Sequence, residues 1–209
     1  MVSKKTVKTT TSPHRPELPG LVLASGSRYR KELLERLGLP FVVAPPELDE
    51  SPRPGEAPAA LALRLAEAKA RAGAQKHPTA LIIGSDQVAE FNGNAVGKPH
   101  DRAHAQQMLS AMSGRTIVFH TALALLNAAN GRLQTALVDV ASTFRALDQR
   151  TIQVYLDRDQ PYDCAGAVRI ESSGIALFTR VASDDPTALI GLPLIRLTDM
   201  LLAEGVKAL

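Results

Sequence analysis

The feature that most constrains the fold is the unbroken apolar segment Ala80-Leu81-Ile82-Ile83-Gly84. A strand with one face in solvent alternates apolar and polar residues, whereas a strand covered on both faces stays apolar throughout. The segment therefore predicts a strand buried between two layers, as in a parallel or mixed sheet of an α/β protein. It runs directly into Ser85-Asp86-Gln87. We expect the strand to end there, with Asp86 at its carboxyl end.

Further strands and helices follow from the apolar pattern and from its breaks. Asn92-Gly93 and Asn130-Gly131 predict hairpin turns, because Asn-Gly accepts the positive φ values of a type I′ turn. The other expected strands span residues 21–24, 41–44, 116–127 and 133–144, and the expected helices span about 29–37, 58–75, 102–112, 148–157 and 188–203. This order predicts a mixed, twisted α/β sheet flanked by helices, without a Rossmann fingerprint.

Charge separates residues 1–19 from the rest of the chain. The 209 residues carry a net charge of +3, from 24 Lys and Arg against 21 Asp and Glu. Four of the basic side chains and one of the acidic ones lie in residues 1–19, which leaves 20 of each in residues 20–209. We expect residues 1–19 to be a disordered basic extension, with an organellar transit peptide as the alternative. Residues 20–209 are expected to form one α/β domain.

Composition also bounds the partners. A neutral body with eight aromatic residues and no Trp argues against nucleic-acid binding. No apolar window is long enough to cross a bilayer, and residues 1–19 lack the apolar segment that a secretory signal contains. The single cysteine allows no internal disulfide and fits a reducing compartment, so a cytoplasmic location is expected.

The loop Ser25-Gly26-Ser27-Arg28-Tyr29-Arg30 is a candidate phosphate site. It joins a strand to a helix, so unpaired backbone N–H groups and the positive end of the helix dipole face a ligand there. Ser25 and Ser27 add hydroxyl donors, and Arg30 adds a two-pronged guanidinium. The alternative is an ordinary cap, in which Ser27 closes the helix and the arginines lie in solvent. The spacing alone leaves both readings open.

Carboxylates and one lysine are further candidates. Asp86 could hold a divalent metal or take a proton from water, or it could cap its own turn. The cluster Glu47, Asp49 and Glu50 suits a hard cation such as Mg²⁺, the alternative being a solvated acidic loop. Lys98, held between a glycine and a proline, could direct its ammonium at a ligand or be a plain turn lysine.

Other chemistries lack the residues they need. His100 and His104 have i, i+4 spacing but no accompanying HExxH glutamate, which argues against zinc. No GxSxG elbow supports Ser/His/Asp hydrolysis. Cys164 has no neighbouring His or Lys to favour its thiolate, and we expect it to be a small core residue.

Six short segments, taken in order, resemble the Maf family of nucleoside triphosphate pyrophosphatases. The segments are Ser25-Gly26-Ser27-Arg28-Tyr29-Arg30, Leu48-Asp49-Glu50, Gly84-Ser85-Asp86-Gln87, Gly97-Lys98-Pro99, Ser113-Gly114-Arg115 and Asp163-Cys164-Ala165-Gly166. The resemblance covers about residues 20–207. It implies an α/β catalytic domain with two lobes around a central cleft, similar to inosine triphosphate pyrophosphatases. It also implies cleavage of a nucleotide between its α- and β-phosphates.

Within that family the chain resembles the branch that hydrolyses 7-methyl-GTP. The branch acting on dTTP and UTP has Asp-Thr in place of Asp86-Gln87, and Lys-Ala-Gly in place of Cys164-Ala165-Gly166. Tyr29 stands where the resembling branch often has Trp, and Glu171 matches its acidic position. The resemblance therefore implies that Tyr29, Gln87 and Glu171 set specificity. Tyr29 could stack on the cationic 7-methylguanine ring, and Glu171 could accept from its N1–H and N2–H₂ edge.

The resemblance also implies a mechanism. A divalent cation, Mg²⁺ or Mn²⁺, would be held by Glu50 and Asp86, and Asp86 would be the base for water attacking the α-phosphorus. The triphosphate would be clamped by Ser25, Ser27, Arg30 and Lys98. A nucleotide is the expected partner, and the family suggests a homodimer. Two alternatives stay open: a pyrophosphatase of canonical nucleotides such as dTTP or UTP, and a non-catalytic regulator of septum formation.

Overall fold

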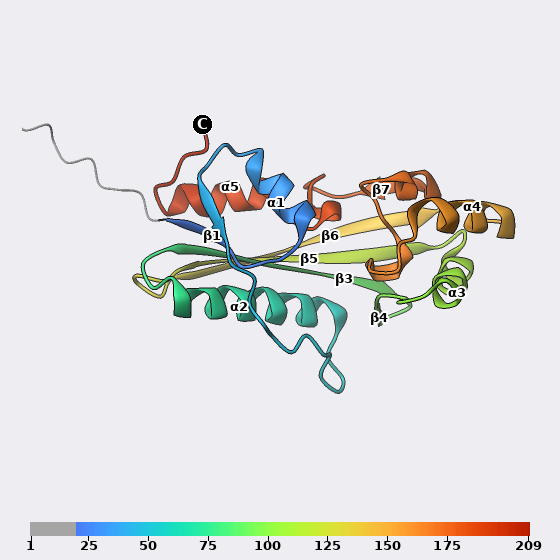
Figure 1. The fold of residues 1–209 in the computed structure, drawn as a ribbon, viewed down its shortest axis with the longest axis horizontal. Helices are drawn as coiled ribbons and strands as arrows, with labels where there is room; N and C mark the ends of the chain where they lie inside the picture. The colour runs from blue at the N-terminus through green and yellow to red at the C-terminus, as the bar shows by residue number, and fades with distance from the viewer. Residues whose placement is uncertain (1–19) are drawn as a thin grey trace, which may run out of the picture.

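The computed structural model describes residues 20–209, and the expectation of a disordered extension at residues 1–19 lies outside them. Within the described part, seven strands form one mixed sheet in the order β2-β1-β3-β5-β6-β7, with β4 paired to β3 (Figure 1). The predicted α/β class, a mixed sheet flanked by helices, is confirmed. None of the helices in residues 20–209 combines the length and hydropathy needed to cross a bilayer.

The elements lie close to their expected positions. The strands are β1 (Leu21–Leu23), β2 (Phe41–Val43), β3 (Leu81–Phe91), β4 (Asn94–Val96), β5 (Thr116–Asn127), β6 (Leu133–Phe144) and β7 (Phe178–Ala182). The α-helices are α1 (Arg28–Glu35), α2 (Pro58–Lys76), α3 (Arg102–Met112), α4 (Gln149–Asp159) and α5 (Leu194–Ala203), and three 3₁₀ turns are η1 (Ala165–Ala167), η2 (Ser173–Leu177) and η3 (Ala188–Ile190). Both predicted hairpins are present, joining β3 to β4 and β5 to β6. Asn92 and Gly93 both have the positive φ of a type I′ turn, whereas in the second hairpin Gly131 has positive φ and Asn130 does not.

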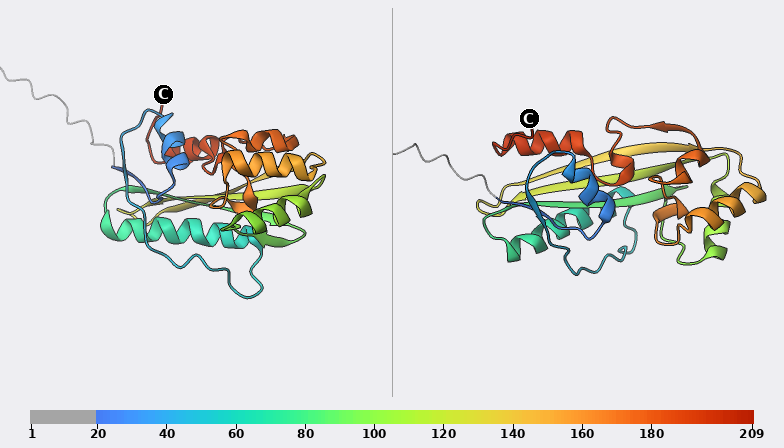
Figure 2. Two further views of the ribbon diagram at one scale, coloured as in Figure 1. Left: turned by 45° about the vertical axis from the view of Figure 1, so that its right-hand side comes forward. Right: turned by 45° about the horizontal axis from the view of Figure 1, so that its top comes forward.

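Helices cover both faces of the sheet (Figures 1 and 2). One face packs against α2. The opposite face carries two apolar clusters. Phe119 and Leu123 lie on that same side of β5, and each belongs to a different cluster. The cluster of Leu123 includes residues of α1 and α5, and the cluster of Phe119 includes residues of α3 and α4. Thr121, buried and polar, lies between them on β5. This arrangement agrees with the expected two lobes.

Strand β3 is longer than the apolar run predicts, and this corrects the position of Asp86. The strand continues to Phe91, because its second half pairs antiparallel with β4 and β5. Asp86 therefore lies in the middle of a strand, and the prediction that it follows the carboxyl end is wrong. On one edge of β3 the pairing with β1 ends at Ile83, and the pairing with β4 starts only at Ala89. We call the stretch between them, residues 84–88, the edge gap of β3.

The predicted helix at residues 188–203 is wrong in its first third. Three residues form η3, the chain then turns at Gly191 with φ +115°, and α5 begins only after Pro193. A left-handed residue followed closely by a proline cannot continue an α-helix. Buried Asp185 fixes the turn by accepting from the backbone N–H groups of Thr187 and Ile195. The backbone carbonyls of Ala188, Leu189 and Gly191 are thereby held toward the sheet, where side chains of β3 and β5 donate to them.

Helix α2 lies unusually close to β3 because two glycines leave room for it. A Cβ on Gly84 would collide with the carbonyl of Ala66 and lie 2.7 Å from the backbone nitrogen of Ala70. A Cβ on Gly73 would lie 2.6 Å from Cγ2 of Ile82. This close approach places the buried side of α2 directly against the middle of β3.

Candidate active site

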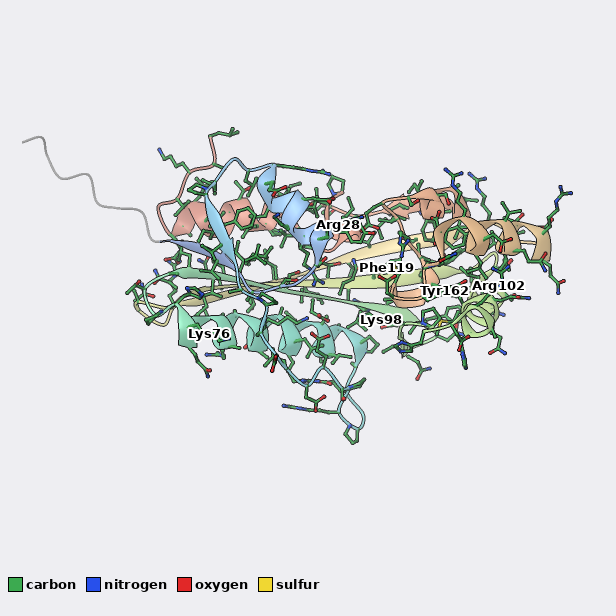
Figure 3. All side chains as sticks on the ribbon, in the orientation of Figure 1. Arg28, Lys76, Lys98, Arg102, Phe119 and Tyr162 are labelled. Atoms are coloured by element: carbon green, nitrogen blue, oxygen red, sulfur yellow. The ribbon has the colours of Figure 1, made fainter. Side chains whose placement is uncertain are left out.

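A pocket of about 790 Å³ opens at the edge gap of β3. Residues 25–30 line one side and residues 163–171 line the other. In Figure 3 the labelled pocket residues Arg28, Lys98 and Phe119 lie near the middle of the molecule, away from Lys76 and Arg102. The lining includes every residue to which the family resemblance gives a role, namely Ser25, Ser27, Tyr29, Arg30, Glu50, Asp86, Gln87, Lys98 and Glu171. Glu47 and Asp49, the other members of the acidic cluster, are exposed and do not line it.

The edge gap explains how consecutive residues of β3 serve one pocket. Side chains alternate along a strand, so Asp86 points to the α2 face and Gln87 to the opposite face. Asp86 contacts Lys69 of α2, whereas Gln87 contacts Thr121 and the turn that precedes α5. No neighbouring strand covers residues 84–88 on this edge within residues 20–209. Both side chains therefore border the same pocket.

Lys69 is a site residue that the sequence reasoning misses. Its Nζ lies 2.6 Å from Oδ1 of Asp86 and 2.7 Å from Oε1 of Glu50. The side chain is 8% exposed, although α2 is otherwise apolar on that side. A signal was present, because Lys69 continues at i+4 the stripe of buried residues Leu61 and Leu65. A charged residue inside such a stripe needs a buried partner.

Together Glu50, Lys69 and Asp86 form a carboxylate–ammonium–carboxylate group. The ammonium has three N–H donors and uses two of them on these carboxylates. The second oxygen of each carboxylate has no partner among the described residues. Carboxylate oxygens suit Mg²⁺ or Mn²⁺, which are commonly held by one or two carboxylates, waters and substrate phosphates. Residues 20–209 contain no group of three or more metal-binding side chains, so the fit is to a shell of this open kind.

The loop of residues 25–30 contains the helix cap that one of the two readings expects. Ser27 caps α1, with its Oγ accepting from the N–H of Arg30 at 3.4 Å. Oγ of Ser25 accepts from the N–H of Ser27 and from Nη1 of Arg30, each at 3.2 Å. Since both hydroxyls act as acceptors in these bonds, their hydrogens remain available for a ligand in the pocket.

Arg30 is fixed at the inner end of the loop. Its Nε donates to the carbonyl of Gly191 at 2.8 Å, which ties α1 to the turn before α5. Burial lowers the pKa of Arg30, and the nearby charges of Asp86 and Glu50 oppose that shift. The guanidinium remains protonated, because its ordinary pKa lies far above neutral pH. The pocket thus contains a desolvated, permanent positive charge beside two carboxylates.

The amide of Gln87 has only one possible orientation. Its Nε2 lies 2.9 Å from Oγ1 of Thr121, 2.9 Å from the carbonyl of Ala188 and 3.1 Å from that of Leu189. Thr121 donates its hydroxyl hydrogen to the carbonyl of Ala188, so its oxygen can only accept a hydrogen bond from Gln87. Turning the amide over would set Oε1 against two carbonyl oxygens with no hydrogen between them. Gln87 therefore offers the pocket a hydrogen-bond acceptor.

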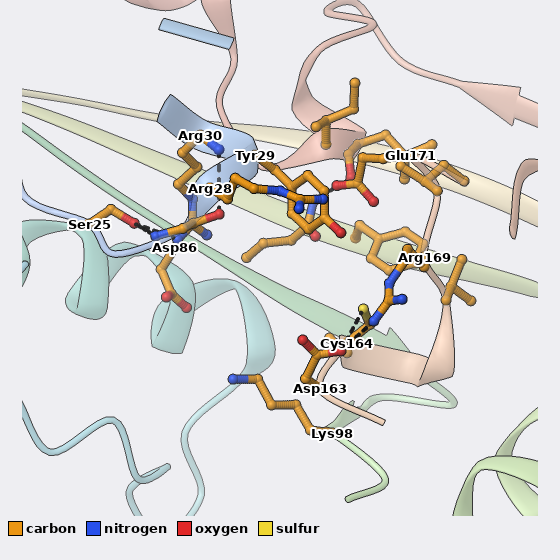
Figure 4. A pocket seen from close by; sticks show the side chains of 18 of the residues that line it. Ser25, Arg28, Tyr29, Arg30, Asp86, Lys98, Asp163, Cys164, Arg169 and Glu171 are labelled. Carbon is orange, nitrogen blue, oxygen red and sulfur yellow. Dashed lines mark hydrogen bonds and ion pairs between the residues drawn. The ribbon is translucent and has the colours of Figure 1, made fainter. Parts of the chain in front are cut away.

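The opposite wall is carried by residues 163–171 (Figure 4). Arg169 holds this segment, donating to the carbonyl of Asp159 at 2.5 Å and to Oδ1 of Asp163 at 2.8 Å. Glu171 lies exposed at the rim, and the partial loss of solvent around its carboxyl raises its pKa. Lys98 is also exposed, and the carbonyl of the preceding Gly97 accepts from the N–H of Gly166 in the same segment.

The expectation that Cys164 is a core residue is wrong. Its side chain is half-buried and lines the pocket. The chain turns at Gly166 with φ +64°, and the next residues inward, Gly166 and Ala167, take the buried positions instead. Burial raises the pKa of the Cys164 thiol to about 11. The group is therefore a neutral, unreactive thiol at physiological pH.

One face of Tyr29 is already occupied. The guanidinium carbon of Arg28 lies 4.9 Å from the centre of the Tyr29 ring, within cation–π distance. Arg28 itself is exposed and pairs with Glu32 on the next turn of α1. A ligand that stacks on Tyr29 must therefore use the other face or displace Arg28.

Comparison with known proteins places the chain in a family. The family model described as "Maf-like protein" matches residues 20–204. A "7-methyl-GTP pyrophosphatase" of Thiobacillus denitrificans is 54% identical over 91% of this chain and 95% of its own length. Proteins of the same name from Methylobacillus flagellatus and Pseudomonas aeruginosa are 52% and 50% identical, over 92% and 91% of this chain and 100% and 99% of their own lengths.

A solved nucleoside-triphosphatase / dITP/XTP pyrophosphatase of Mycobacterium abscessus is 19% identical. It aligns with a TM-score of 0.40 over 61% of this chain and 75% of that one. An overlap of this size carries no conclusion about fold or function. The family model and the relatives at 50% identity or more do, and by both measures the chain is a member of the Maf-like protein family.

Proposed function

We propose that this chain is a nucleotide pyrophosphatase that hydrolyses 7-methyl-GTP to 7-methyl-GMP and pyrophosphate, with residues 20–209 acting as one catalytic domain. Relatives that carry this activity in their names match it over nearly their whole lengths. The observation that carries the proposal is the group of Glu50, Lys69 and Asp86 beside the phosphate loop. This group places two carboxylates, which could bind a metal and a water molecule, next to the hydrogen-bond donors that could bind a triphosphate.

The triphosphate binds between α1 and the arm that carries Lys98. The free hydroxyl hydrogens of Ser25 and Ser27 and the guanidinium of Arg30 face it from the loop side. Lys98 binds it from the other side, and Lys69, which also lines the pocket, has one N–H beyond the two used on Glu50 and Asp86. Together these groups neutralise phosphate charge in a partly desolvated site, where such contacts are strongest.

Glu50 and Asp86, each with one carboxylate oxygen free, would hold a divalent cation, Mg²⁺ or Mn²⁺. When bound, the ion neutralises charge that develops on the phosphates. Asp86 orients a water molecule and takes its proton as the oxygen bonds to the α-phosphorus. The bond from that phosphorus to the oxygen bridging the α- and β-phosphates breaks, and pyrophosphate leaves with its electron pair. Lys69 holds Asp86 in position for this step through its 2.6 Å contact with Oδ1.

Base recognition depends on two acceptors. Oε1 of Gln87 and the carboxylate of Glu171 both belong to residues that line the pocket. The N1–H and N2–H₂ groups of 7-methylguanine are donors and match them. Uracil and thymine place carbonyl oxygens on both sides of their single N–H, which disfavours them at such a site. The positive charge of the methylated ring adds attraction to Glu171 and to the open face of Tyr29.

A substrate panel with pyrophosphate detection tests this function. We expect 7-methyl-GTP to be preferred over GTP, UTP and dTTP, and to require added Mg²⁺ or Mn²⁺. Asp86→Asn should lower kcat by about 10²–10⁴-fold, the usual contribution of a positioned base. A preference for UTP or dTTP would support the canonical-nucleotide alternative. Near-normal turnover by Asp86→Asn would contradict the mechanism.

The remaining expectations are also proposals. We propose that the protein acts as a homodimer in the cytoplasm, as its family and its single cysteine suggest. Light scattering on a sizing column separates a monomer of 22.3 kDa from a dimer of twice that mass.

A further inference from the structure

Arg64 attaches the loop that carries Glu50 to helix α2. Its Nε lies 2.6 Å from Oε1 of Glu56, and its Nη2 lies 2.8 Å from Oε2 of the same carboxylate. Nη2 also donates to the carbonyl of Ser51 at 3.0 Å. Ser51 is the residue directly after Glu50, so this clamp ends one peptide away from the proposed metal-binding carboxylate.

The loop between β2 and α2 depends on such contacts for its shape. It contains no helix or strand from residue 44 to residue 57. Local bonds close residues 49–56 into a unit: Asp49 accepts from the N–H of Ser51 at 2.9 Å, and Glu56 accepts from that of Arg53 at 3.0 Å. Among the described residues, the side-chain bonds from this unit to α2 are those of Arg64 at one end and the Glu50–Lys69 pair at the other.

The side chains of these two attachments differ in how much of them is exposed to solvent. The side chain of Glu50 is 53% exposed, so packing does not fix it. The side chains of Glu56 and Arg64 are only 10% and 21% exposed. The guanidinium of Arg64 lowers the pKa of Glu56 to about 2, and the pair therefore stays charged over the whole pH range in which the protein would be assayed.

We propose that Arg64 is a positioning residue, which through Glu56 and the Ser51 carbonyl holds Glu50 at the metal site. The inference rests on the proposed function only in that Glu50 is taken to bind the metal. The role requires the planar two-pronged guanidinium, because a lysine ammonium cannot serve both carboxylate oxygens and the carbonyl in one geometry.

Binding of Mn²⁺, followed by electron paramagnetic resonance, tests the proposal without relying on turnover. We expect Arg64→Met to weaken Mn²⁺ binding about tenfold, as loss of a supporting contact to a metal ligand commonly does. Arg64→Lys should restore only part of it. The matched control is Arg71→Met, because Arg71 pairs with Glu67 on the exposed side of the same helix at 3.7 Å. That variant should bind Mn²⁺ as the parent protein does.

A double variant separates positioning from general destabilisation. If Arg64 acts through Glu50, Arg64→Met should weaken Mn²⁺ binding no further in a Glu50→Gln background. Equal losses in both backgrounds would overturn the proposal, and so would unchanged binding in Arg64→Met. Should Arg64→Met fail to fold, Glu56→Gln removes the charged partner of Arg64 from the clamp and is expected to weaken Mn²⁺ binding with the same dependence on Glu50. If Glu50→Gln itself binds Mn²⁺ normally, the proposed ligand role of Glu50 fails instead.

Discussion

At the scale of single residues, Lys69 offsets the cost of placing two carboxylates at the pocket. Replacing it with Met would leave the buried charge of Asp86 without a partner, which typically costs about 3–5 kcal/mol. We expect Lys69→Met to lower the free energy of unfolding by about that amount, measured by urea denaturation. Adding Asp86→Asn should recover most of the loss, because the stranded charge is then gone. A single variant as stable as the parent would refute this account.

Gln87 allows a test of its amide orientation. Gln87→Glu would replace the inward-pointing donor with an oxygen facing the carbonyls of Ala188 and Leu189. The ionised form is disfavoured there, so the pKa of the new carboxyl rises on folding. Stability is then retained at low pH and lost as pH rises through that raised value. We expect a loss of about 1–3 kcal/mol near pH 8 relative to the parent, and a smaller one near pH 5, by thermal unfolding.

Glu171 predicts a pH dependence of substrate preference. Partial burial raises its pKa above the ordinary value of 4.5. Only the ionised carboxylate accepts from the base edge on both oxygens, so recognition fails as pH falls through the raised pKa. We expect kcat/KM for 7-methyl-GTP to decline on the acid side at a pH above 4.5. This limb should be weaker or absent in Glu171→Gln, and an identical limb in both proteins would exclude Glu171 as its source.

At the scale of elements, the contact between α2 and β3 aligns Lys69 with Asp86. Gly84→Ala would push the helix away, because the added methyl meets the backbone of Ala66 and Ala70. We expect lower stability together with a loss of turnover that exceeds it, since a small displacement of catalytic groups is costly. Gly20→Ala is the control, because nothing lies within 4 Å of its added Cβ. Equal behaviour of the two variants would show that the close contact is unimportant.

The elements also show which local patterns were informative. The Asn-Gly turns and the strands that flank them depend on neighbouring residues, and the structure confirms those predictions. The continuation of β3 through Ser85-Asp86-Gln87 was missed, because polar residues that face a pocket look like a loop. The interruption at Gly191 was missed because the apolar periodicity runs on through it. In both cases tertiary contacts override the local pattern.

At the scale of the whole molecule, we expect charged side chains that lie outside the pocket to have little effect on catalysis. The body carries as many basic as acidic side chains, and the excess lies in residues 1–19. We expect a variant lacking residues 1–19 to keep kcat/KM for 7-methyl-GTP within about twofold, as surface charge acts chiefly on association. It should lose retention on a cation-exchange column. A changed ranking of substrates would show that residues 1–19 take part in binding.

The pocket itself was only partly predictable. The order of the short motifs pointed to residues that now line one cavity, from Ser25 to Glu171. The sequence could not show that Lys69 joins Glu50 to Asp86, or that Arg64 reaches back to Ser51. Those contacts depend on how closely a helix approaches a strand and on how a long loop folds. Neither can be inferred from the spacing of residues along the sequence.

The edge gap of β3 has a consequence for engineering. Along these few residues, even-numbered Asp86 faces Lys69 and the proposed hydrolytic group, and odd-numbered Gln87 faces the proposed base-recognition side. Because side chains alternate along the strand, neighbouring positions serve two different proposed tasks, hydrolysis at one and base recognition at the next. A designer can exchange the odd position and its neighbours on the far wall to alter which base is accepted, while the machinery that breaks the anhydride is left in place.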